Sequence, residues 1–169
     1  GYAINAILGT KAVMESCNST FISSTFWTER IGPTAALETL NVMEKTRSWE
    51  SITKKGQKIK KNWKKLSKIY GLELEIKGID AIPNFRFISK NHLAYKTYIS
   101  QEMLKKKFLA SNTIYCSTAH KDDLLNKYFD ILDNVFLKIK KFETNEVDYK
   151  KFLETPISIS GLRENSKKD

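Results

Sequence analysis

The chain has 169 residues, of which 41% are hydrophobic, so it can bury the core of one domain or of a large fragment of a bigger fold. It contains no apolar run approaching about eighteen residues, which excludes a membrane span. Cys17 and Cys116 are its only cysteines. They are too few for a disulfide framework and lack metal-ligand spacing, so the sequence favours a reduced, cytoplasmic setting without a metal.

The net charge of +10 comes from lysine, because the 29 basic residues are 25 lysines and 4 arginines. Specific nucleic-acid sites favour arginine, whose planar fork matches phosphates and guanine edges. A surface rich in lysine and poor in arginine is more typical of a solvated surface than of a dedicated polyanion site. We therefore expect neither a nucleic-acid nor a membrane partner, although the charge alone decides little.

The first third of the chain has the pattern of an α/β fold. Residues 1–9 are small and apolar and predict a strand buried on both faces of a parallel sheet, whose neighbouring strands we expect to be encoded upstream. A short helix over 10–16 and a second strand over 21–27 follow. The next helix carries Pro33 in its first turn and continues to Glu44, and its N-terminus presents backbone N–H groups suited to an anion.

Residues 49–70 predict the clearest amphipathic helix. Its apolar positions alternate spacings of four and three, and eight lysines fill the other faces. The apolar positions are Ile52, Gly56, Ile59, Trp63, Leu66 and Tyr70. The helix could bind a membrane surface or nucleic acid, or it could be an ordinary surface helix with lysine outside and the core inside. The second interpretation is favoured, because the stripe has one residue per turn and the whole chain is rich in lysine.

After Gly71 the period changes to alternation, which predicts an antiparallel pair of strands at 72–77 and 85–87. A helix over 94–107, a third short strand over 113–117 and a long helix from Asp122 follow. This α+β pattern predicts a boundary near residue 70. We expect residues 1–70 to form one domain, 71–154 a second with a short antiparallel sheet covered by helices, and 155–169 a polar, loosely packed tail.

Three stretches in fixed order resemble the class III aminotransferases, and especially their glutamate-1-semialdehyde aminomutase-like branch. The first, residues 1–9, resembles the strand that follows the family's Schiff-base lysine. The second, residues 24–37, resembles the segment in which a threonine five residues before a proline reaches the cofactor's phosphate. The third, residues 102–110 followed by 117–120, resembles the small C-terminal domain. Together they extend over the chain to about residue 145.

This resemblance implies the C-terminal portion of a fold-type I pyridoxal-phosphate-dependent transferase: the end of the large domain and the small domain. The implied activity is transfer of an amino group between small molecules through a Schiff base, in a homodimer with active sites at the subunit interface. Thr28 would contact the phosphate of pyridoxal phosphate bound by the partner subunit, and Trp27 would either line the same site or lie in the core. His120 matches a structural position, His92 is expected in a surface loop, and no catalytic residue is assigned.

Two departures from the family pattern bear on activity. The Schiff-base lysine would lie immediately before Gly1, so we expect the chain to be inactive alone. We also expect the isolated chain to self-associate, or its first thirty or so residues to be displaced from their native place. Residues 110–120 are shorter than in the aminomutases and lack their glutamate, which leaves the amino donor and acceptor open. The alternatives are a stand-alone lysine-rich module for nucleic acid or an acidic partner, and a non-catalytic partner of another chain that carries the lysine.

Overall fold

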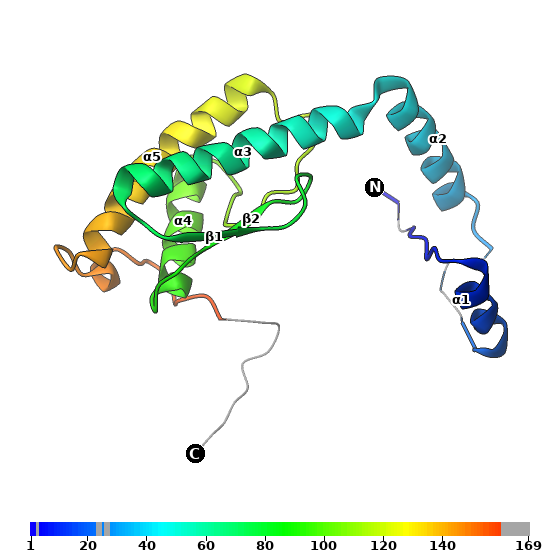
Figure 1. Ribbon diagram of the computed structural model, residues 1–169, viewed down its shortest axis with the longest axis horizontal. Coiled ribbons are helices and arrows are strands. Elements are labelled where there is room, and N and C mark those ends of the chain that lie inside the picture. Colours follow the sequence, from blue (N-terminus) through cyan, green and yellow to red (C-terminus); the bar gives the residue numbers. More distant parts are fainter. Residues whose placement is uncertain (3, 23–24, 26–27, 160–169) are drawn as a thin grey trace, which may run out of the picture. The chain divides into compact units, whose positions relative to one another are not determined.

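The computed structural model describes residues 1–2, 4–22, 25 and 28–159. The chain divides into two compact units, Gly1–Ser48 and Trp49–Asp169 (Figure 1). The predicted boundary near residue 70 does not coincide with this division, because the long helix before Gly71 packs into the second unit. Assignment of residues 1–70 and 71–154 to the large and small domains of a complete enzyme stays a prediction.

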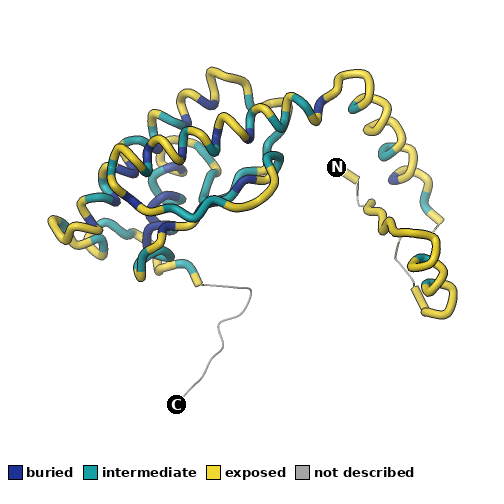
Figure 2. The backbone as a smooth tube through the Cα atoms, in the orientation of Figure 1, coloured by how far each residue is buried: buried dark blue, intermediate teal, exposed yellow. Residues whose placement is uncertain are grey.

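The first unit is helical and has little core. It contains α1 (Lys11–Glu15), the 3-10 helix η1 (Ser16–Ser19) and α2 (Ile31–Thr46), which ends at Arg47 in a left-handed conformation with φ of 48°. Figure 2 shows this unit as largely exposed in its described residues. The predicted helices at 10–16 and after Pro33 are therefore confirmed, although each begins or ends a few residues from its expected bounds.

The predicted strand over residues 1–9 is wrong for this chain. Its described residues have no regular structure, and Leu8 is 90% exposed. A strand of this kind is stabilised by pairing with neighbours, and the described part of the chain offers it none. Of the second predicted strand, Phe21, Ile22 and Thr25 lie outside any strand, and its other residues lie outside the described part.

The second unit is a two-stranded antiparallel sheet with helices packed against it. Its elements are α3 (Ser48–Tyr70), β1 (Leu74–Lys77), β2 (Asn84–Phe87), α4 (His92–Lys105), α5 (Asp122–Glu143) and η2 (Tyr149–Lys151). The register pairs Leu74 with Phe87 and Lys77 with Asn84. The predicted sheet and the three long helices of this part are confirmed.

The predicted third strand, residues 113–117, is reduced to an isolated bridge between Thr113 and Asn84. Its segment still runs along the residues just before β2, since the N–H groups of Ile114 and Cys116 donate to the carbonyls of Pro83 and Ala81 at 3.1 and 2.9 Å. Pro83 has no N–H to return such a bond, so a continuous ladder cannot form.

The core of the second unit is built on the apolar stripe of α3. Ile59 and Trp63 are fully buried, and the centroid of the Trp63 ring lies 4.7 Å from that of Phe85 on β2. The indole N–H of Trp63 donates to the hydroxyl of Tyr128 on α5 at 2.9 Å. The stripe is therefore core, as the favoured interpretation of this helix predicted, and it joins α3, the sheet and α5.

Hydrogen bonds join α4 to the segment that follows η2. The Gln101 side chain donates to the carbonyl of Phe152 and accepts the N–H of Glu154, both at 2.8 Å. The N–H of Ser158 donates to the Thr97 hydroxyl at 2.9 Å. Within residues 155–159 the bonds to α4 are those of Ser158, and the other four residues are exposed. The loosely packed tail over 155–169 therefore stays a prediction.

Candidate cofactor phosphate site

Thr28 lies in a turn shortly before α2, and its side chain is exposed. This position leaves the hydroxyl accessible to a ligand, close in sequence to the first turn of the helix. Trp27, the other residue predicted for the site, lies outside the described residues. The structure therefore gives Thr28 the accessibility that a phosphate contact requires.

The N-terminus of α2 has the character of an anion site. The carboxylate of Glu29 accepts the backbone N–H of Gly32 at 3.4 Å, and Pro33 has no N–H to offer. The N–H of Thr34 donates to the carbonyl of Arg30 at 3.1 Å. A carboxylate at a helix N-terminus is stabilised by the partial positive charge of the free N–H groups. A phosphate at this position would be stabilised in the same way, and would compete with Glu29 for the Gly32 N–H.

Residues 110–120 are held against α3. The ammonium group of Lys55 donates to the carbonyls of Thr118 and Ser117 at 2.8 and 3.2 Å. The N–H of Ser117 donates to Nδ1 of His120 at 3.2 Å. Burial, with a contribution from Lys55, lowers the pKa of His120 below its ordinary value of 6.5, so the ring is neutral at pH 7 and can accept this bond. His120 thus has a structural contact, in line with its expected role.

His92 differs from its expected position. It is the first residue of α4 and is partly buried, whereas the sequence placed it in a surface loop. Asn91 precedes the helix without a side-chain cap, although asparagine is a common capping residue. The helix thus begins earlier than its apolar pattern indicated.

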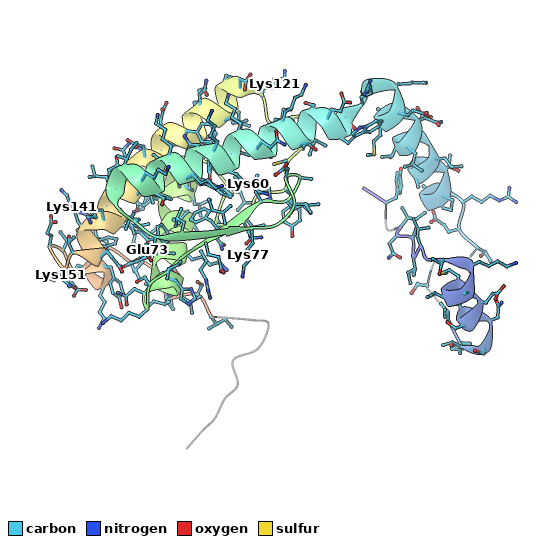
Figure 3. All side chains as sticks on the ribbon, viewed as in Figure 1. Lys60, Glu73, Lys77, Lys121, Lys141 and Lys151 are labelled. Atoms are coloured by element: carbon cyan, nitrogen blue, oxygen red, sulfur yellow. The ribbon has the colours of Figure 1, made fainter. Side chains whose placement is uncertain are left out.

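The sequence did not reveal that three lysines of α3 form hydrogen bonds or ion pairs with other segments of the unit. Besides Lys55, Lys58 forms an ion pair with Asp122 at 2.6 Å. Lys60 (labelled in Figure 3) forms an ion pair with Asp80 at 2.9 Å and donates to the carbonyl of Gly78 at 2.7 Å. Hydrogen bonds from Lys60 and Gln57 lower the pKa of Asp80. The positions of Lys55 and Lys60 could have indicated this, because both directly flank the apolar stripe.

Other reactive groups give no second site of this kind. Burial raises the pKa of the Cys116 thiol, whose Sγ lies 3.7 Å from the Asp80 carbonyl oxygen, so it is a poor nucleophile at neutral pH. Within the described residues, no group of His, Cys, Asp and Glu side chains could hold a metal ion. No helix in this part of the chain is long and apolar enough to span a bilayer.

Comparison with known proteins gives relatives in both sequence and structure, although no family model matches. Aminopentol aminotransferase of Sphingopyxis macrogoltabida is 29% identical over 87 residues, which is 52% of this chain and 21% of that protein. The 3-aminobutyryl-CoA aminotransferase of Cloacimonas acidaminovorans (strain Evry) is 29% identical over 97 residues, 57% of this chain and 23% of that protein. The chain therefore spans between a fifth and a quarter of these curated relatives.

The structure is similar to that of the FumI protein of Sphingopyxis sp. MTA144, solved in its pyridoxal-phosphate internal aldimine form. The match has a TM-score of 0.67 at 19% sequence identity and covers 86% of this chain and 36% of the FumI chain. The fold is thus shared with part of a pyridoxal-phosphate-dependent protein, in agreement with the fold that the resemblance implied.

Proposed function

We propose that this chain is the C-terminal part of a pyridoxal-phosphate-dependent enzyme that transfers an amino group between small molecules. The observation that carries the proposal is the FumI-like fold over 86% of the chain. Two sequence relatives, both aminotransferases, support it independently. Bound pyridoxal phosphate supplies the carbonyl that takes up the amino group and the ring that stabilises the adjacent carbanion.

The role of this chain in the site is to bind the phosphate. Thr28 donates its hydroxyl to a phosphate oxygen, and the N-terminus of α2 adds the partial positive charge of its N–H groups. The exposed position of Thr28, just before α2, supports this assignment. The cofactor is held mainly by the other subunit of a cytoplasmic homodimer, so each active site needs residues from both chains.

Amino transfer is favoured over the aminomutase reaction. Residues 110–120 lack the glutamate that aminomutases carry there, and the two sequence relatives are aminotransferases. From the resemblance to the family we infer that the Schiff-base lysine is not among the lysines of this chain. The chain alone is therefore inactive.

Amino transfer to a 2-oxo acid tests the proposal directly. The complete enzyme, supplied with pyridoxal phosphate, should convert a primary amine and a 2-oxo acid into a carbonyl compound and an amino acid. The donors should include an α-amino acid, a long-chain amino alcohol and a β-amino thioester. This chain alone should give no turnover above free cofactor. Absence of transfer with every donor, or turnover by this chain alone, would count against the proposal.

A further inference from the structure

The outward face of α3 carries a regular row of lysines, which we call the outer lysine stripe: Lys54, Lys58, Lys61, Lys65 and Lys68. Their spacings are four, three, four and three, which keeps them on one line along the helix. All five are exposed. Each lies two residues after or before a member of the buried stripe, and two residues turn an α-helix by about 200°. The outer lysine stripe is therefore diametrically opposite the core face.

The charge of this stripe has little compensation from the fold. From Ser51 to Tyr70, α3 contains no acidic residue. Lys58 pairs with Asp122, whereas within the described residues no hydrogen bond or ion pair involves the other four lysine ammonium groups. The lysines that serve the fold, Lys55 and Lys60, flank the buried stripe instead. The outward row is thus not explained by the stability of the unit.

The lysine-rich composition alone led us to expect no nucleic-acid partner, but the placement of these lysines on one uncompensated line changes that expectation. We propose that the outer lysine stripe binds the phosphodiester backbone of a nucleic acid, in addition to the proposed aminotransferase function and independently of it. The stripe is about 21 Å long at 1.5 Å per residue, which corresponds to about six phosphates along one strand of a duplex. Lysine binds phosphate as a point charge and reads no base pattern without arginine or amide partners. The binding is therefore independent of base sequence.

A bilayer surface fits this helix less well. Helices that lie in the membrane interface insert their apolar face among the lipids. In α3 that face is buried against the sheet and α5, and Ile59 and Trp63 have no exposed surface. The exposed apolar side chains of α3, Trp49 and Ile69, lie at its two ends. The outer lysine stripe between them offers charge, in the linear arrangement that a phosphodiester chain also has.

The test compares two variants of the full chain that lose the same charge. The stripe variant is K54Q/K61Q/K65Q/K68Q, and the matched control, K90Q/K106Q/K141Q/K151Q, removes four exposed lysines scattered over other elements (Lys141 and Lys151 are labelled in Figure 3). Glutamine keeps the helix propensity of lysine within a few tenths of a kcal/mol, so both should fold. Circular dichroism checks that both variants are as helical as the wild type. If the stripe variant is less helical, the double variant K61Q/K65Q takes its place.

Binding is measured by fluorescence anisotropy with a labelled DNA duplex of about 20 base pairs over a range of salt concentrations. The stripe variant should lower the slope of log K against log salt by about 3, and the control by less than about 1. Two unrelated duplex sequences should bind equally. Equal weakening by both variants would reduce the effect to net charge and overturn the proposal. So would undetectable binding by the wild type, or tighter stripe-dependent binding to phosphatidylserine vesicles or to polyglutamate than to DNA.

Discussion

Gly56 shows how one residue fixes the approach of α3 to the loop after β1. A Cβ atom placed there would lie 1.6 Å from the carbonyl oxygen of Asp80. Glycine inside a helix normally costs about 1 kcal/mol relative to alanine. Glycine at this position lowers the helix propensity of α3 but allows a close contact with the backbone of Asp80. Beside this contact, Gln57 and Lys60 donate to the Asp80 side chain.

Replacing Gly56 with alanine should therefore destabilise the protein, although most such changes in a helix stabilise it. We expect the free energy of unfolding to fall by about 2–4 kcal/mol, because the loop after β1 must move away from α3. Chemical denaturation measures this. The control Lys64→Ala, at an exposed position of the same helix, should stay within about 0.5 kcal/mol of the wild type. A Gly56→Ala protein as stable as the wild type would show that the two segments do not touch.

His120 gives a prediction for pH. Its folded-state pKa is lowered by burial and by Lys55, so the unfolded chain binds the proton more readily than the folded chain. The contribution of His120 is therefore present above pH 6.5 and is lost as the pH falls below that value towards the lower folded-state pKa. In His120→Asn, whose amide oxygen can accept the Ser117 N–H, the loss of stability below pH 6.5 should be smaller. Denaturation curves at several pH values test this, and parallel profiles for the two proteins would refute it.

At the scale of elements, α3 and α5 are joined by a polar contact inside the core. The Trp63 N–H donates to the Tyr128 hydroxyl, and burial raises the pKa of this tyrosine. Tyr128→Phe leaves the indole N–H without a partner and should cost about 1–3 kcal/mol. In the background of Trp63→Phe, the same change should cost less than about 1 kcal/mol, because no donor is left unpaired. Equal costs in both backgrounds would mean that the bond contributes nothing.

The four long helices and the two strands could be predicted because each has a continuous apolar period. Residues 1–9 also have such a composition, but a strand forms only when its partners are present, and sequence pattern does not report partners. Residues 113–117 were predicted as a strand because nothing within them breaks one. The proline that prevents a continuous ladder, Pro83, lies in the segment beside them. The helix that follows Thr28 was predicted, whereas the bond from the Gly32 N–H to the carboxylate of Glu29 was not, since an acidic residue before a helix is common.

At the scale of the whole molecule, the two units should differ in stability. Among the described residues, every buried hydrophobic side chain lies between Ile59 and Phe142. The first unit instead exposes Leu8 and Phe21 almost completely. Such apolar side chains favour association, and in a complete enzyme we expect the rest of the large domain to cover them.

A chain that begins at Ser48 should therefore keep its thermal midpoint within about 2 °C of that of the full chain. It should also sediment as a monomer at concentrations where the full chain associates. Calorimetry and analytical ultracentrifugation measure the two properties. A midpoint lower by about 8 °C or more, or association of the shortened chain, would show that the second unit is not independent.

The central claim is that this chain supplies a phosphate contact to a cofactor, and the affinity of the complete enzyme for pyridoxal phosphate tests it most directly. Equilibrium titration of the cofactor-free protein should show that Thr28→Ala raises the dissociation constant about three- to tenfold, which corresponds to the loss of about 0.7–1.4 kcal/mol, the net contribution of one typical hydrogen bond. Thr28→Ser should restore most of the affinity, and Thr25→Ala should leave it unchanged. An identical dissociation constant for the wild type and Thr28→Ala would contradict the claim.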